Sequence, residues 1–271
     1  CTVTNTRQTA TLQIAKAWSG TSPATDSATI GVTTGGLNNT TSFTTAGGTS
    51  ANSGTAVTVA VGNTITFPAE TGTNIGNYNT VLSCLAGGGA TANALSGTNG
   101  QVSNTLVIGA GDSGKAIVCT YTNTRIAQNL TLVKQWTNAA TGHTATVTTT
   151  GGTNNSTFNA TAPSTGLTGT TVTVYAGDVV TLPVETFGGG ASVSDYNSTV
   201  ACTGGSTLVS GAVGRSVTIS NSTTATTCTY SNTGLSDMVP TLTYMPNTGI
   251  VGSPYYGKFT CTNNGIAPAT A

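Results

Sequence analysis

The chain of 271 residues has a formal net charge of zero, and only 5% of its residues are charged, against about 25% in an average soluble domain. It has no basic run that would neutralise a phosphate backbone and no apolar run long enough to span a bilayer. One histidine and six cysteines without a Cys-x-x-Cys pair give no metal-binding pattern. These features argue against nucleic acid as a partner, and we expect no metal, no cofactor and no membrane span in this segment.

Threonine and valine alternate along much of the chain, which favours half-buried strands over helices. Residues 1–6 read CTVTNT, and close variants recur as CTYTNT from Cys119 and CTYSNT from Cys228. Because self-similarity at a long period indicates a tandem array, the sequence predicts an all-β chain of tandem β-sandwiches. Residues 1–6 are then the closing strand of an upstream unit.

The first repeat, residues 7–125, opens with the strand TATLQIAKAW. The two-residue period of a strand places Leu12, Ile14, Lys16 and Trp18 on one face, which is otherwise apolar. We therefore expect the lysine to point inward.

The middle of this repeat is a series of short strands and turns. Pro68 interrupts the strand TITFPAE, and because proline cannot donate to a ladder, we expect this strand to lie at a sheet edge or to carry a bulge beside Glu70. A strand led by Tyr78, a long Gly/Ala loop and the segment NTLVIG precede the closing strand KAIVCTYTNTR. On that last strand Cys119 and Asn123 share the inward face.

The second repeat, residues 126–234, follows the same order element by element. Its opening strand LTLVKQW places Lys134 on the apolar face, and its closing CTYSNT places Asn232 inward. The step from the turn glycine to Glu185 and the step from the leading tyrosine to the next cysteine both equal those of the first repeat. Residues 235–271 lack the Lys-x-Trp strand and read as a partial third β-domain.

Two cysteines of each repeat occupy equivalent positions, one after the Tyr-led strand and one on the closing strand. This pattern predicts the disulfides Cys84–Cys119 and Cys202–Cys228. Disulfides are typical of oxidising compartments, so we expect the chain to be secreted.

Cys1 and Cys261 are left over after these pairs. If the chain is a filament subunit, residues 1–6 of one copy complete the unfinished sheet of residues 235–271 of the next by strand addition. An inter-subunit bond between Cys1 and Cys261 then joins the copies head to tail. In the alternative, both ends were cut from a longer array and their partners are missing.

The chain has only two glutamates, and each repeat combines one of them with an inward lysine and an asparagine on the closing strand. The trios are Lys16, Glu70 and Asn123, and Lys134, Glu185 and Asn232. A buried ammonium group is costly unless it is paired or loses its proton. In an apolar core the lysine and the carboxyl exchange a proton and become neutral, which frees the amine to attack the asparagine carbonyl. Loss of ammonia then yields a Lys–Asn isopeptide crosslink between the first and last strands.

This arrangement resembles the collagen-adhesin B-type and pilin (prealbumin-like) domains of bacterial surface proteins. In that family a first-strand lysine bonds to a last-strand asparagine, with an intervening glutamate as the catalyst. The likeness covers both full repeats and implies Ig-like or prealbumin-like β-sandwiches, with Glu70 and Glu185 as the catalysts. One departure from the family pattern is the proline two residues before each glutamate. Residues 235–271 resemble the start of another bacterial surface β-sandwich repeat, which adds no site.

A simpler interpretation of each trio is a partly buried ion pair, with the asparagine capping a turn. Trp18 and Trp136 continue apolar faces, so we expect them in the core rather than as sugar-binding platforms. His143 lies in a Thr-rich turn, where we expect a structural role.

These patterns predict a structural component of a bacterial extracellular filament, pilus or surface stalk. Its expected partners are other copies of itself in a head-to-tail filament, or flanking repeats of a longer chain. The alternative is an adhesin module whose loops bind a glycan or a host or matrix protein. With one histidine and few carboxylates, we expect no enzyme activity beyond autocatalytic crosslinking.

Overall fold

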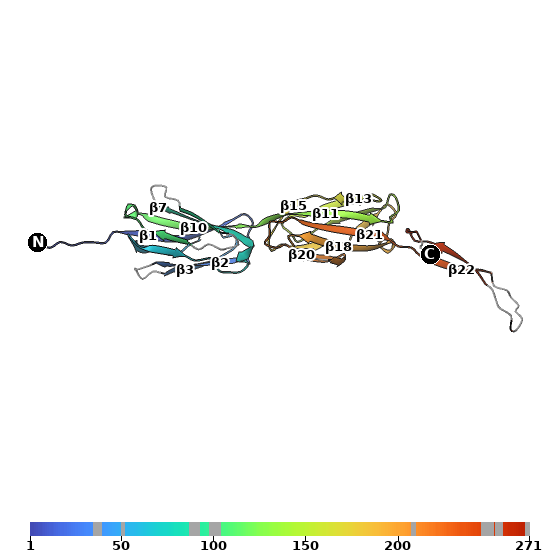
Figure 1. Ribbon diagram of the computed structural model, residues 1–271, viewed down its shortest axis with the longest axis horizontal. Helices are drawn as coiled ribbons and strands as arrows, with labels where there is room; N and C mark the ends of the chain where they lie inside the picture. The colour runs from blue at the N-terminus through green and yellow to red at the C-terminus, as the bar shows by residue number, and fades with distance from the viewer. Residues whose placement is uncertain are drawn as a thin grey trace. The chain divides into compact units, whose positions relative to one another are not determined.

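The computed structural model describes residues 1–34, 40–49, 52–86, 93–97, 104–206, 210–244, 252 and 257–268. Contacts between Cα atoms divide the chain into two compact units. The first comprises Cys1–Ala127, Tyr175–Gly177 and Ser220–Ser222, and the second comprises Gln128–Val174, Asp178–Ile219 and Thr223–Ala271. The regular secondary structure of both is almost entirely β-strand, as the sequence predicts (Figure 1).

The first unit is a sandwich of two sheets (Figure 1). One sheet has the order β4 (Asn52–Ser53), β1 (Thr9–Ser19), β10 (Ala116–Arg125), β7 (Tyr78–Ala86) and β8 (Asn93–Gly97), with β5 (Val57–Ala60) also pairing with β1. The other has the order β3 (Thr40–Ala46), β2 (Ser27–Thr34), β6 (Thr64–Phe67) and β9 (Asn104–Val107). Most of the Gly/Ala loop expected before β9 lies outside the described residues.

The second unit repeats this plan with shorter pieces. Its continuous sheet has the order β14 (Leu167–Thr168), β11 (Ala127–Thr137), β21 (Thr226–Gly234), β18 (Tyr196–Gly204) and β19 (Ser210–Ala212), with β15 (Val172–Tyr175) on β11. Facing it are the sheet β13 (Thr157–Thr161), β12 (Thr144–Thr148) and β17 (Thr186–Gly188), and the pair β16 (Val179–Leu182) and β20 (Arg215–Thr218).

Short 3-10 turns connect some of the strands. They are η1 (Ile75–Asn77), η2 (Ala110–Asp112) and η3 (Val193–Asp195). Across the part of the chain that the structure describes, none of the helical segments is long and apolar enough to cross a membrane.

In each unit the first and last strands are parallel neighbours at the centre of one sheet. β1 runs beside β10 from Thr11 to Ser19, and β11 runs beside β21 from Leu130 to Thr137. Residues more than a hundred positions apart in the first unit are therefore joined by a continuous ladder. This pairing brings the two ends of each repeat together.

The core of each sandwich is filled by the alternate side chains that the sequence places inward. In β1, Leu12, Ile14 and Lys16 are fully buried and Trp18 is 8% exposed. The equivalent positions of β11 are buried in the same way. The strand period thus predicts correctly which face of each opening strand packs on the opposite sheet.

The described residues at the two ends of the chain lie outside the two sandwiches. Residues 1–8 form no strand, and residues 1–6 are exposed. In residues 235–271, β22 (Met238–Tyr244) and β23 (Lys258–Asn263) form a two-stranded sheet whose described side chains are largely exposed. Neither segment, as far as it is described, contains the hydrophobic core that a complete sandwich has.

Candidate crosslinking site

The site in the first unit begins with the ladder between β1 and β10. Lys16 pairs with Tyr121, and Asn123 follows two residues later on β10, so both side chains leave the sheet on the same face. Lys16 and Asn123 are both 0% exposed. The structure therefore places the predicted lysine and asparagine side by side on the inner face of the first and last strands.

A β-bulge turns Glu70 toward this face. β2 pairs with β6 at Thr66, opposite Thr33, and again at Thr71, opposite Thr29. Four residues lie between the two paired positions on the side that carries Glu70 and three lie between them on the β2 side, and such an extra residue reverses the alternation of side chains. β6 lies between β2 and β9, so the predicted edge position is wrong and the predicted bulge is right.

The second unit contains the same bulge. β12 pairs with Thr186 at Thr146 and with Thr181 at Thr150, which again leaves one extra residue on the side that carries Glu185. The carboxyl groups of both glutamates are fully buried. The proline that departs from the family pattern therefore marks the bulge that aims the carboxyl inward.

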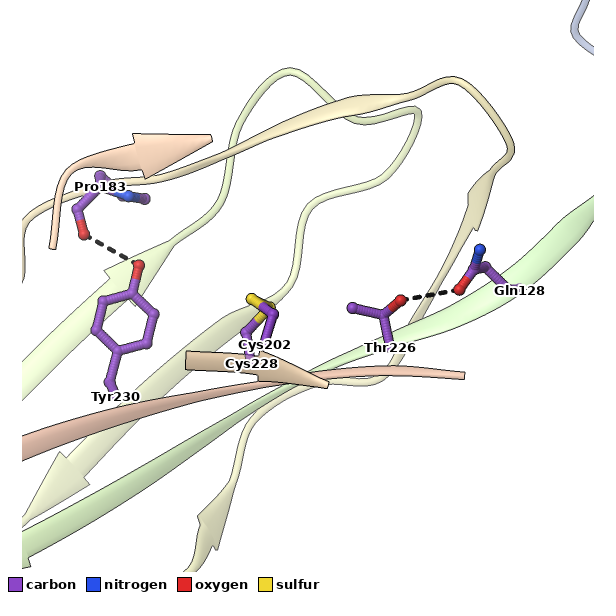
Figure 2. The surroundings of a disulfide bond; sticks show 6 residues. All are labelled: Gln128, Pro183, Cys202, Thr226, Cys228 and Tyr230. Carbon is purple, nitrogen blue, oxygen red and sulfur yellow. Dashed lines mark hydrogen bonds between the residues drawn. A yellow bond between two sulfur atoms is a disulfide. The ribbon is translucent and has the colours of Figure 1, made fainter. Parts of the chain in front are cut away.

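A tyrosine of the closing strand fixes each bulge. The Tyr121 hydroxyl donates to the carbonyl of Pro68 over 3.0 Å, and the Tyr230 hydroxyl donates to the carbonyl of Pro183 over 3.0 Å (Figure 2). Burial raises the pKa of both tyrosines, and the nearby glutamate raises it further. They remain hydrogen-bond donors at neutral pH and link each bulge to the strand that carries the asparagine.

Lysine and glutamate form a buried ion pair in both units. Lys16 Nζ lies 2.8 Å from Glu70 Oε1, and Lys134 Nζ lies 3.0 Å from Glu185 Oε1. Desolvation lowers the pKa of each lysine from 10.5 to about 8, although the glutamate acts in the opposite direction. Burial thus raises the fraction of lysine in the neutral form, which is the form that attack on an amide requires.

Each lysine also lies over an aromatic ring. The Nζ atom is 4.6 Å from the ring centroid of Trp18 in the first unit and 4.4 Å from that of Trp136 in the second. The rings cover the amine on the inner face, next to the strand that carries the asparagine. Both tryptophans are core residues, as expected.

Thr80 connects the glutamate of the first unit to its asparagine. The Thr80 hydroxyl lies 3.1 Å from Glu70 Oε2 and 2.8 Å from Asn123 Oδ1. Thr80 is directly opposite Asn123 in the antiparallel ladder of β7 and β10, and it is fully buried. Sequence reasoning missed this residue, although the matched segments YNT and YNS already show a hydroxyl at this position of both repeats.

The asparagine of the second unit is held differently. Ser198 lies opposite Asn232 in the ladder of β18 and β21. Among the described residues, neither the Ser198 hydroxyl nor the amide group of Asn232 has a hydrogen-bond partner. The trio is assembled, but its asparagine is not tied to the glutamate.

The disulfides Cys84–Cys119 and Cys202–Cys228 are present, and each joins directly opposed residues of neighbouring strands (Figure 2). They are the pairs that the sequence predicts. Cys1 and Cys261 are free and exposed, so a bond between copies stays a prediction.

His143 has a structural contact. Its Nδ1 lies 2.7 Å from the hydroxyl of Tyr196. Within the described ranges, no group of three or more His, Cys, Asp or Glu side chains is placed to hold a metal ion. The loops expected to bind a glycan or host protein in the adhesin alternative lie partly outside these ranges.

Residues 9–125 match the family model of the prealbumin-like fold domain. This match covers the whole first trio and both strands that carry it, as the resemblance noted from the sequence implies. No curated protein matches the chain.

Solved structures of bacterial surface proteins are similar to the two units taken together. The major pilin T-13 of Streptococcus pyogenes has 11% identity and a TM-score of 0.41, over 84% of this chain and 100% of the pilin. A Mobiluncus mulieris adhesin, described as containing intramolecular disulfide, isopeptide and ester bond crosslinks, has 14% identity and a TM-score of 0.30, over 79% of this chain and 86% of the adhesin.

Proposed function

We propose that this chain is a structural component of a bacterial extracellular filament, pilus or surface stalk, in which each sandwich is locked by a Lys–Asn isopeptide bond. The observation that carries the proposal is the same buried trio in both units. Two ion pairs with no exposed atoms stand at equivalent places, each beside a buried asparagine. A buried ion pair is weak evidence for stability on its own, so a second role explains its repetition.

The proposed reaction needs no external reagent. Lys16 transfers its proton to Glu70, and the neutral Nζ attacks Cγ of Asn123. The new Nζ–Cγ bond forms, the Cγ–Nδ2 bond breaks, Nδ2 leaves as ammonia with a second proton from the lysine, and the ammonia then takes up the proton that Glu70 holds. The carboxyl of Glu70 returns to its starting state, which makes it a catalyst. Lys134, Glu185 and Asn232 perform the same steps in the second unit.

The topology supports a load-bearing role for these bonds. Because the first and last strands are parallel neighbours, a chain pulled at its two ends applies tension to both at once. A bond from Lys16 to Asn123 carries that tension across residues 17–122. The sandwich between the bonded residues is then protected from unfolding under force, which suits a stalk or filament.

The intact mass of the reduced, denatured protein tests the proposal. We expect the wild type to be lighter than its sequence by two ammonia molecules. Glu70→Ala and Glu185→Ala should each restore the mass of one ammonia molecule, and the double variant should restore the mass of both. Asp112→Ala, which removes an acidic residue outside both trios, is the matched control and should keep both losses. A wild-type mass equal to the sequence mass would overturn the proposal.

The head-to-tail bond between Cys1 and Cys261 is a separate part of the proposal. Its support is that both thiols are free and exposed and that β22 and β23 form an isolated two-stranded sheet, which is marginal by itself. A non-reducing gel should show a ladder of oligomers that collapses on reduction and disappears in Cys1→Ser. A single monomer band under oxidising conditions contradicts this part alone.

A further inference from the structure

We propose that Thr80 is a catalytic residue of the first crosslink. Its hydroxyl accepts a hydrogen bond from the protonated carboxyl of Glu70 and donates one to the carbonyl oxygen of Asn123. This inference rests on the proposed crosslinking function and adds a participant to it. Its basis is an unbroken path of short contacts from Lys16 through Glu70 and Thr80 to Asn123.

The direction of the hydrogen bonds follows from the groups involved. A threonine hydroxyl has one proton to donate, and an amide oxygen can only accept. An ionised carboxylate also only accepts, so the hydroxyl can donate to Glu70 Oε2 in the ion pair, and once Glu70 is protonated the hydroxyl donates to Asn123 Oδ1, over 2.8 Å. Its own oxygen is then left to accept a hydrogen bond from Glu70 Oε2, at 3.1 Å. This second bond requires the carboxyl to be protonated.

The proton that Glu70 needs is the one that Lys16 gives up. Nζ contacts Oε1, while the relay starts at Oε2, so the two oxygens of one carboxyl serve the nucleophile and the electrophile. When the proton moves from the lysine to the glutamate, the same event frees the amine and completes the relay to Asn123. The activation of both reaction partners is thereby coupled.

The relay acts where negative charge develops. As Nζ adds to Cγ, the carbonyl oxygen of Asn123 gains negative charge, and a preorganised donor at that atom lowers the barrier. The hydroxyl is held in place because Thr80 is fully buried and stands directly opposite Asn123 in the ladder. Its β-branched side chain has few rotamers. When the intermediate collapses, the Cγ–Nδ2 bond breaks, ammonia leaves, and the hydroxyl keeps its own proton.

The second unit offers a natural counterpart. Ser198 occupies the position of Thr80, but its buried hydroxyl has no hydrogen-bond partner among the described residues. Serine lacks the methyl group that restricts the rotamer. We therefore infer that the relay is not formed in the resting second unit and that its crosslink forms more slowly than the first.

The test follows crosslinking in newly made protein. The full chain is produced by cell-free synthesis, samples are denatured at intervals, and digestion with mass spectrometry measures the Lys16–Asn123 and Lys134–Asn232 peptides separately. Thr80→Val keeps the shape of the side chain and removes the hydroxyl. It should slow the first crosslink by about 100-fold, the usual effect of removing one such donor, while leaving the second unchanged. Thr80→Ser keeps the hydroxyl but loses the methyl group that restricts the rotamer, so its rate should lie between those of wild type and Thr80→Val.

Two further variants complete the experiment. Ser198→Thr should accelerate the second crosslink, and Thr122→Val, on the outer face of β10, should change neither rate. Formation of the Cys84–Cys119 disulfide in Thr80→Val shows that the first unit has folded. If that disulfide is absent, two other rates test the relay. They are the rate of the first crosslink in Thr80→Ser relative to wild type, and the rate of the second crosslink in Ser198→Thr.

The outcomes separate the two proposals. A first crosslink that forms at the wild-type rate in Thr80→Val, with both bonds present in the wild type, overturns the relay and leaves the crosslinking function standing. The relay is also overturned if Ser198→Thr has no effect and Thr80→Ser is as slow as Thr80→Val. Absence of both bonds from the wild type overturns the crosslinking function, and the relay with it.

Discussion

The two candidate crosslinking sites share one framework and differ in how their asparagines are held. In both, a bulge aims a glutamate at a lysine, at 2.8 Å in the first unit and 3.0 Å in the second. A tyrosine donates to the proline carbonyl of the bulge at 3.0 Å in each. Only the first unit ties its asparagine to the glutamate, through Thr80. The ladder and the bulge thus place the lysine and the glutamate alike in both units, while the hydrogen bonds of the asparagine differ with the residue opposite it, Thr80 or Ser198.

The rim of each core shows a second contrast. Trp18 donates from Nε1 to the Thr45 hydroxyl over 3.0 Å, whereas Nε1 of Trp136 has no partner within the described residues. The tyrosine packed edge-on against each tryptophan is also held by different groups. Tyr78 donates to Asp26 in the first unit, and Tyr196 contacts His143 in the second. The same packing geometry therefore tolerates different polar partners.

The largest expected effect concerns extension under force. With the disulfides reduced, a wild-type chain pulled at its ends should show no unfolding of either sandwich, because the crosslinks bypass the enclosed segments. Glu70→Ala should add one unfolding event, in which the first sandwich releases residues 17–122, which span roughly 350 Å when extended. Glu185→Ala should release residues 135–231, roughly 320 Å. Single-molecule stretching measures both lengths, and wild-type events of these lengths would contradict the proposed bonds.

The next effect is a pH dependence that appears only without the crosslink. In Asn123→Ala the Lys16 amine stays free, and its folded pKa of about 8 lies below its ordinary value of 10.5. Between these values the unfolded chain binds more protons, so the free energy of unfolding should rise with pH by at most about 1.4 kcal/mol per pH unit.

Urea denaturation followed by circular dichroism, at a series of pH values, measures this slope. Wild type is the control, since an amide nitrogen does not titrate and its unfolding should lack the extra slope. Asn232→Ala should behave like Asn123→Ala, because the pKa of Lys134 is also lowered to about 8. A slope of the opposite sign, or one shared with wild type, would show that these lysines do not titrate as the buried pairs predict.

The smallest effect concerns the two tryptophans. Trp18→Phe leaves the buried Thr45 hydroxyl without its donor, whereas Trp136→Phe removes an indole N–H that had no partner among the described residues. Both variants lose similar ring volume, so Trp18→Phe should destabilise its unit by about 1 kcal/mol more. Hydrogen exchange of peptides from β10 and β21 reports the two units separately. Equal losses of protection would show that the Trp18 hydrogen bond contributes nothing net.

The sequence by itself determined the features that follow from local periodicity and from the repeat. The inward position of Lys16, the cysteine pairs and the composition of both trios could all be predicted, because strand alternation and equal spacing are visible along the chain. The sequence also indicated that Pro68 marks an irregularity. It did not decide between an edge and a bulge, since that choice depends on which strands flank β6.

Only the tertiary structure decided how distant strands are aligned. The parallel pairing of β1 with β10 places Asn123 beside Lys16, and the extra residue opposite β2 turns Glu70 inward. The ladder of β7 with β10 puts Thr80 opposite Asn123. Register between strands is set by the packing of whole sheets against each other rather than by any one segment. For that reason the hydroxyl that links Glu70 to Asn123 became visible only in the folded chain.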